Sequence, residues 1–125
     1  MTPENTKYLV ETYPHLYRET FYFECGDGWF DLLKELSEKL EPLFAPYRER
    51  HSCRIVQVKE KFGGLRYYTG FYPSEESKKI EAAIEEAEKK AWVTCEVCGE
   101  PGKVRYGGWI STLCNKHHME GSPEE

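Results

Sequence analysis

The sequence has no uninterrupted apolar segment that approaches the ~20 residues needed to span a bilayer. Its first residues, 1–4, contain neither a basic cluster nor an apolar run, so a secretory signal is not expected. These absences predict a cytoplasmic protein with no membrane partner, in which thiols stay reduced. The five cysteines are therefore expected to be metal ligands and buried thiols rather than disulfide partners.

An excess of positive charge is also absent, since 22 acidic and 17 basic side chains give a net charge of −5 at pH 7. A protein that binds nucleic acid irrespective of its sequence usually carries positive charge. The chain lacks the phosphate-binding glycine loops, the serine nucleophile elbow and the zinc-protease helix that identify many enzymes. No catalytic residue is predicted, and the protein is expected not to be an enzyme.

The most specific motif that is present lies near the C-terminus, where Cys95, Cys98, Cys114 and His117 are spaced as C-x2-C-x15-C-x2-H. Zn²⁺ prefers four tetrahedral ligands of thiolate sulfur and imidazole nitrogen. The motif therefore predicts Zn²⁺ as the cofactor, and four protein ligands predict a structural rather than a catalytic ion. His118 is an alternative fourth ligand, although the spacing of His117 is the commoner one.

The sequence around these ligands predicts a treble-clef-like zinc finger over residues 93–120. Two short strands are expected at 103–106 and 109–113, joined by a pair of glycines, and the last two ligands are expected to begin a short helix. The remaining tail, 121–125, is expected to be disordered.

Residues 1–92 are expected to form a small α+β core in which helices cover a β-hairpin. Helical spacing of apolar side chains predicts helices over about 3–11, 28–41 and 74–92. Alternation of apolar and polar side chains predicts the hairpin over about 54–69. The expected fold class is therefore α+β, with the finger appended at the C-terminus.

Several local features of this core are specific enough to be tested. Asp27 is expected to cap the helix over 28–41, and Pro42 to stop or kink it. The pair Gly63-Gly64 is expected to form the hairpin turn, which would place Lys61 directly opposite Arg66. In that register, the buried face of the hairpin is expected to consist of Val56, Val58, Phe62, Leu65 and Tyr67.

The opposite, basic face of the hairpin is the best candidate binding surface. It combines cations with an aromatic side chain, as proteins that bind phosphate backbones and stack bases do. The solvated side of a half-buried hairpin has the same character, and the acidity of the chain favours this simpler interpretation. The candidate face comprises Lys59, Lys61, Arg66 and Tyr68 on the hairpin, with Lys103 and Arg105 on the finger.

Four segments of the sequence together resemble a family of small proteins encoded by phages and prophages. The segments are FECGDGWFDLL, QVKEKFGGLRYY, TCEVCGEPG and GGWISTLC, and the resemblance extends from about Tyr8 to His118. The resemblance implies a zinc finger and a location in the bacterial host cytoplasm during infection or lysogeny, but it supplies no activity.

The closed metal site, the negative charge and the abundance of aromatic residues favour a non-enzymatic, zinc-stabilised accessory protein. Its expected partner is a host or phage protein, including a host-defence or regulatory factor. Nucleic-acid binding through the basic hairpin face is the alternative, and an enzyme with an unrecognised site is the third possibility. The sequence indicates no particular oligomeric state.

Overall fold

A computed structural model describes residues 1–72 and 74–121. Within these residues the fold is α+β, with four α-helices, two β-hairpins and a Cys/His cluster beside the second hairpin. Of the predicted tail, 121–125, Gly121 belongs to the last helix, and residues 122–125 lie outside the described residues, as does Pro73. The elements are α1 (Pro3–Thr12), α2 (Phe30–Phe44), β1 (Ile55–Lys61), β2 (Gly64–Thr69), α3 (Ser77–Ala91), β3 (Lys103–Arg105), β4 (Ser111–Leu113) and α4 (Asn115–Gly121).

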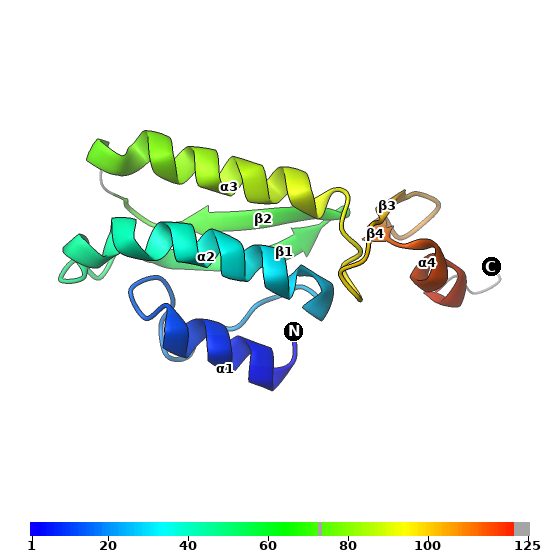
Figure 1. The fold of residues 1–125 in the computed structure, drawn as a ribbon, viewed down its shortest axis with the longest axis horizontal. Coiled ribbons are helices and arrows are strands. Elements are labelled where there is room, and N and C mark those ends of the chain that lie inside the picture. Colours follow the sequence, from blue (N-terminus) through cyan, green and yellow to red (C-terminus); the bar gives the residue numbers. More distant parts are fainter. Residues whose placement is uncertain (73, 122–125) are drawn as a thin grey trace.

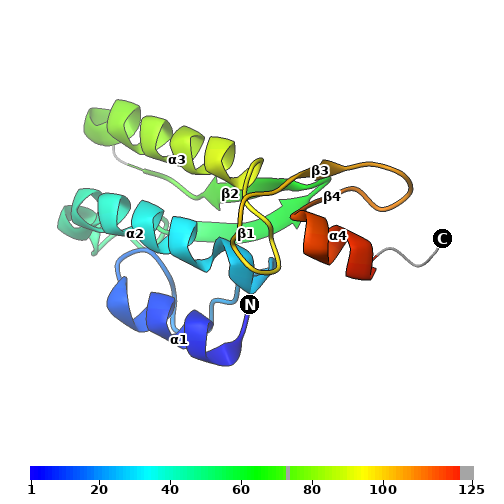
Figure 2. The same cartoon turned by 45° about the vertical axis from the view of Figure 1, so that its right-hand side comes forward.

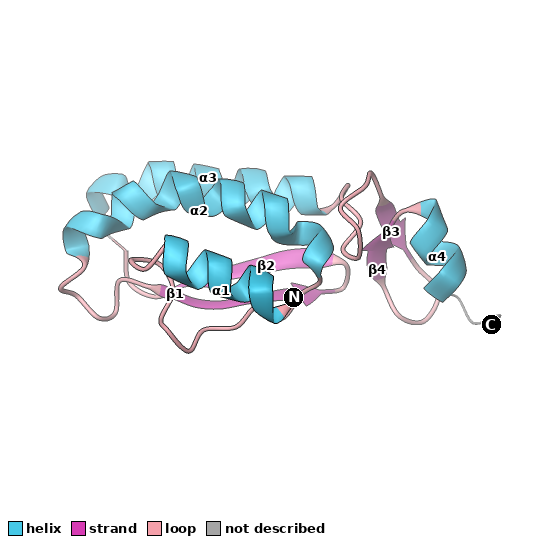
Figure 3. Ribbon diagram, turned by 60° about the horizontal axis from the view of Figure 1, so that its bottom comes forward, coloured by secondary structure: helices cyan, strands magenta, loops and turns pink. Residues whose placement is uncertain are grey.

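The core has a helix layer over a strand layer. Figure 1 shows α2 and α3 side by side along the antiparallel β1–β2 hairpin, with β3, β4 and α4 at one end of the molecule. Figure 3 shows the two layers separately, with α1 next to them. None of the helices in the described residues combines the length and apolar character needed to cross a bilayer.

Helix α2 supplies much of the core because its apolar side chains recur at helical spacing. The helix continues through Pro42 and ends at Phe44, so the predicted stop at Pro42 is wrong. Pro42 lies in the last turn, where it removes one hydrogen bond, and Phe44, two residues later, is fully buried. The buried side chains of this helix are Leu32, Leu33, Leu36, Ser37, Leu40 and Phe44.

A buried polar network joins three parts of the core. The hydroxyl of Tyr17 lies 2.7 Å from the hydroxyl of Ser37 on α2 and 2.7 Å from that of Tyr67 on β2. Ser37 in turn donates to the carbonyl of Leu33 at 2.7 Å. Burial raises the pKa of Tyr17 and of Tyr67 well above the usual range, so both phenols stay protonated and can act as donors.

The turn of the β1–β2 hairpin is formed by Phe62 and Gly63, one residue earlier than predicted. Both have positive φ angles, 56° and 86°, which suit the twist of a two-residue hairpin turn. As a consequence Arg66 lies opposite Lys59 rather than opposite Lys61, and that part of the prediction is wrong.

The buried face of the hairpin also differs from the prediction at two positions. A β-bulge between Ile55 and Gln57 turns Ile55 into the core and leaves Val56 63% exposed. Phe62 is 62% exposed because it sits in the turn. The remaining predicted members of this face are buried, and they are Val58, Leu65 and Tyr67.

The outer edge of β1 is covered by the segment that precedes α2. The N–H of Glu24 donates to the carbonyl of Val58 at 2.9 Å, and the N–H of Glu60 donates to the carbonyl of Glu24 at 3.0 Å. This parallel bridge fixes the start of the FECGDGW segment beside the hairpin.

Asp27, in the same segment, does not cap the predicted helix and instead bonds to the start of α1, whose N-cap is Thr2. Its carboxylate accepts from the N–H of Thr2 at 2.8 Å and from the side chain of Asn5 at 3.1 Å. These bonds anchor the N-terminus of α1, whereas α2 begins after Trp29 with no side-chain cap. The prediction of Asp27 as the cap of the second helix is therefore wrong.

Candidate metal centre

Three cysteines and one histidine converge between the end of α3 and the start of α4. One ligand atom from each of Cys95, Cys98, Cys114 and His117 lies within 4.8 Å of all the others. Cys98 Sγ and Cys114 Sγ are 3.8 Å apart. His117 Nδ1 lies 3.7 Å from Cys95 Sγ and 3.3 Å from Cys114 Sγ. The histidine brought into this cluster is His117, and its neighbour His118 is not part of it.

These distances fit a single tetrahedral ion. Zinc bonds of about 2.3 Å to sulfur and about 2.0 Å to nitrogen place neighbouring ligand atoms about 3.5–3.8 Å apart. The three separations given above, 3.7, 3.8 and 3.3 Å, lie close to those edges. The four residues are therefore able to hold one metal ion, and a cluster of three sulfurs and one nitrogen suits Zn²⁺.

The first two ligands lie on a tight turn that we call the knuckle, residues 95–99. The N–H of Gly99 donates to the carbonyl of Cys95 at 2.9 Å, and the N–H of Cys95 donates to the carbonyl of Glu100 at 2.8 Å. Gly99 has a φ of 85°, which a side chain would disfavour. This geometry points both thiols of the knuckle to one side, so that they can share an ion.

The second pair of ligands lies at the junction of β4 and α4. Cys114 follows the last residue of β4, and His117 lies in the first turn of α4. The N–H of His117 points at Cys114 Sγ over 3.4 Å, and the N–H of His118 donates to the carbonyl of Cys114 at 2.9 Å. The helical turn thus sets the C-x2-H spacing.

Within the knuckle, the surroundings of Cys95 favour a thiolate, whereas the pKa of Cys98 is raised, in part by its neighbours Cys95 and Cys114. Burial acts to raise the pKa of the Cys95 thiol, but backbone N–H groups, foremost that of Cys114, outweigh it and lower the pKa to about 6. Metal binding requires deprotonated cysteine. A low pKa therefore lowers the free energy needed to remove the proton before the metal binds.

The knuckle is docked on the segment before α2. The N–H of Gly28 donates to the carbonyl of Glu96 at 2.7 Å, and the N–H of Gly26 donates to the Glu96 carboxylate at 2.8 Å. The indole of Trp29 donates to the carbonyl of Thr94 at 2.9 Å. Figure 2 shows the loop after α3 passing beside the start of α2. The metal ligands are thus held against the core from the N-terminal side of the finger.

The finger is also joined to the tip of the β1–β2 hairpin. Thr112 of β4 is fully buried, and its hydroxyl donates to the carbonyl of Gly63 at 2.6 Å. A Cβ on Gly64 would lie 2.7 Å from the ring of Trp92, so the ring fills the space that a side chain would need. The hydrogen bond from Thr112 therefore holds the second hairpin against the turn of the first.

The two hairpins enclose a groove of about 310 Å³, which we call the junction groove. Two residues of the predicted binding face, Lys59 and Lys61, line it. The others do not: Arg66 is half-buried beside them, and Tyr68 is 44% exposed elsewhere on the sheet. The residues that line the groove are Lys59, Glu60, Lys61, Phe62, Gly108, Trp109 and Ile110.

The two cations predicted to extend the binding face onto the finger differ in their contacts: Arg105 makes hydrogen bonds within the finger, and Lys103 is exposed. Lys103 is exposed on β3. Arg105 donates to the carbonyl of Leu113 at 3.1 Å and to the side chain of Asn115 at 2.8 Å, which braces β4 and the start of α4. A role of either residue in binding stays a prediction.

Sequence reasoning missed the aromatic part of the junction groove. Phe62 was expected in the core and Trp109 in a strand, whereas Trp109 is 83% exposed in the loop between β3 and β4. The neighbouring Tyr106 is 75% exposed. The available signal was the pair Gly107-Gly108, whose positive φ angles of 105° and 96° form the loop that carries Trp109.

Comparison with models of known protein families, with curated proteins and with solved structures finds no match to this chain. The resemblance to proteins of phages and prophages therefore stays a prediction, and the function has to be inferred from the residues themselves.

Proposed function

We propose that this chain is a non-enzymatic, zinc-stabilised accessory protein that binds a segment of another protein, of host or phage origin, in the junction groove. The observation that carries the proposal is the exposure of Trp109 and Phe62 on two short turns that flank one groove. We also infer that the finger is treble-clef-like, because its order of knuckle, hairpin and helix start is the one typical of that class.

Rigid, exposed aromatic side chains are the residues that most often dominate binding energy at protein interfaces. Trp109 lies on the finger and Phe62 on the hairpin turn, and Lys59 and Lys61 add positive charge at the same groove. We infer that the partner segment carries apolar and acidic side chains, which these groups complement.

The metal contributes shape rather than chemistry in this proposal. Four protein ligands complete the coordination of zinc, so no position remains for a substrate. The ion holds β3 and β4 against the knuckle, and the bond from Thr112 to Gly63 holds the finger against the hairpin. Zinc loss is thus expected to separate the walls of the groove.

The test compares capture by the zinc-loaded chain with capture by Trp109→Ala. Affinity purification from bacteria under phage infection, followed by mass spectrometry, identifies the candidate partner, and titration of the purified partner gives its affinity. Truncation of a central aromatic residue is expected to weaken binding by 2 kcal/mol or more, about thirtyfold. Tyr22→Ala is the matched control, because Tyr22 is 67% exposed and does not line the groove.

A partner that binds wild type and Trp109→Ala equally would contradict the proposed groove. Failure to recover any specific partner from infected and uninfected cells would contradict the proposal of a protein-binding function.

The alternative function is nucleic-acid binding in the same groove, favoured by the combination of Lys59 and Lys61 with the exposed rings of Tyr106 and Trp109. It predicts an affinity for single-stranded probes that falls with salt and is reduced by Lys59→Glu. Fluorescence anisotropy at low salt measures it, and a flat titration with single- and double-stranded probes would exclude it.

A further inference from the structure

A second cavity lies at the end of the β1–β2 hairpin that is remote from the finger. It has a volume of about 370 Å³ and is formed by the loop after α1, the segment before β1, the first residues of β1 and the residue after β2. The N–H of Ile55 donates to the carbonyl of Leu16 at 2.9 Å, and the N–H of Gly70 donates to the carbonyl of Arg54 at 2.8 Å. These two hydrogen bonds connect the loop after α1 to the start of β1, and the residue after β2 to the segment before β1.

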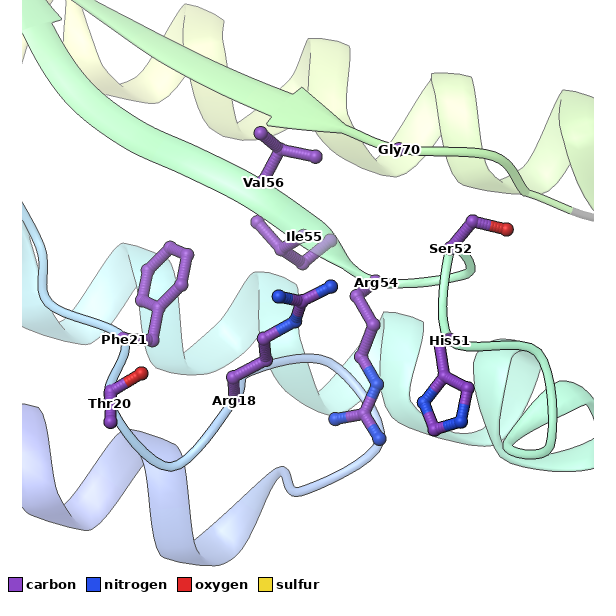
Figure 4. A pocket seen from close by; sticks show the side chains of 9 residues that line it. All are labelled: Arg18, Thr20, Phe21, His51, Ser52, Arg54, Ile55, Val56 and Gly70. Atoms are coloured by element: carbon purple, nitrogen blue, oxygen red, sulfur yellow. The ribbon is translucent and has the colours of Figure 1, made fainter.

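Positive charge is concentrated in this cavity. Figure 4 shows the side chains of Arg18, Arg54 and His51 gathered around it, and no carboxylate is among the described residues that line it. The chain as a whole has a net charge of −5, so a cavity lined by two guanidinium groups and an imidazole departs from the rest of the molecule. Such a site attracts an anion.

The two arginines are available to a ligand. Arg54 donates one N–H to the carbonyl of Pro14 at 2.8 Å, which fixes the side chain and leaves most of its five donors unused. The Arg18 guanidinium has no hydrogen-bond or ion-pair partner within residues 1–72 and 74–121. Two guanidinium groups side by side can bind several oxygens of one phosphoryl group at once.

The remainder of the cavity is apolar. Phe21 lines one side, and Figure 4 shows Ile55 and the exposed Val56 across from it. The bond from the N–H of Phe21 to the carbonyl of Arg18, at 2.9 Å, closes the turn that brings this ring and the first guanidinium to the same cavity. An aromatic ring beside cationic donors suits a ligand that joins a planar group to an anion.

We propose that this cavity binds a small phosphorylated ligand with a planar apolar part, of the class of the nucleoside phosphates. The cations bind the phosphoryl oxygens, and the base lies against Phe21 and the aliphatic side chains. A volume of about 370 Å³ lies in the usual range for small-ligand sites. The site is separate from the junction groove, so it does not depend on the function proposed for that groove.

Isothermal titration calorimetry of the zinc-loaded full chain at low salt tests the proposal with three probes: adenosine monophosphate, adenosine and inorganic phosphate. The monophosphate is expected to bind at least tenfold more tightly than either of the other two, because only it engages both parts of the cavity. Arg18→Gln is expected to weaken this binding about tenfold, the loss typical of one charge-assisted contact.

Arg48→Gln is the matched control. It removes the same charge from an exposed arginine that donates to the carbonyl of Ala45 and does not line the cavity. Its affinity for the monophosphate is expected to match that of wild type. Absence of binding by the monophosphate, or equal losses in Arg18→Gln and Arg48→Gln, would overturn the site. Equal affinity for inorganic phosphate and the monophosphate would overturn the part assigned to the apolar side chains.

Discussion

At the scale of single residues, the contact between the finger and the core depends on positions without a side chain. Gly26 and Gly28 both donate backbone N–H groups to Glu96, which lies between two metal ligands. A Cβ on Gly28 would lie 2.1 Å from the carbonyl oxygen of Cys95. The backbone of the core therefore reaches the backbone of the metal site directly.

Gly28→Ala is expected to lower the free energy of unfolding by about 2–3 kcal/mol and to weaken zinc binding, since the knuckle has to move. Chemical denaturation and competition with a zinc indicator measure the two effects. Gly107→Ala serves for comparison: it adds strain at a φ of 105° in open space, and about 1 kcal/mol is expected there. Equal losses of stability and zinc affinity in the two variants would contradict the claim that the close approach of Gly28 to the Cys95 carbonyl matters.

Asp27 provides a prediction that depends on pH. Hydrogen bonds, first that from the N–H of Thr2, lower the pKa of its carboxyl below 3.8. A carboxyl whose folded pKa is depressed stabilises the protein above its unfolded pKa and loses that effect as the pH falls through the folded value. The stability difference between wild type and Asp27→Asn is thus expected to be full at neutral pH and to shrink below pH 3.8. Denaturation of both proteins across this range measures it, and a constant difference would contradict it.

At the scale of elements, one hydroxyl joins the two hairpins. Thr112→Val keeps the side-chain volume but removes the bond to Gly63, so the carbonyl of Gly63 loses its partner inside the protein. The expected loss of stability is about 1–2 kcal/mol. Thr94→Val is the control, because its hydroxyl bonds the carbonyl of Lys90 within its own segment. Hydrogen exchange near the hairpin turn should increase in the first variant and stay unchanged in the second.

The element pattern also shows what the sequence can predict. Apolar spacing identified helices near their observed positions because burial of one face determines α2 and α3. The hairpin turn was misplaced because Gly63 and Gly64 allow two registers from sequence alone. The Trp92 ring, 2.7 Å from a Cβ on Gly64, excludes a side chain there, and such a tertiary contact leaves no local signal.

The metal centre was more predictable than the two cavities. The C-x2-C and C-x2-H spacings encode local turns, so the convergence of Cys95, Cys98, Cys114 and His117 follows from short-range geometry. The junction groove and the cavity around Arg18 combine segments that are distant in the chain. Their composition depends on how hairpins and loops pack, which residue spacing does not specify.

At the scale of the whole molecule, zinc removal is expected to affect the two ends differently. Structural zinc contributes on the order of 10 kcal/mol in small fingers. Chelation, or Cys98→Ser, is expected to unfold the finger while α1, α2 and α3 keep their helical structure, because their buried cluster forms without finger residues. Elemental analysis should give one zinc per chain, and circular dichroism with and without chelator measures the helix that remains. Loss of all helical signal on chelation would contradict this division.

The covering of β1 by Glu24 has a consequence for behaviour in concentrated solution. A two-stranded ribbon ordinarily offers unpaired N–H and C=O groups along both sides, and such groups template pairing between molecules. Here the bridge through Glu24 occupies part of the outer side of β1, around Lys59. That side of the ribbon is thereby shielded from intermolecular strand addition, the first step towards fibrillar aggregates.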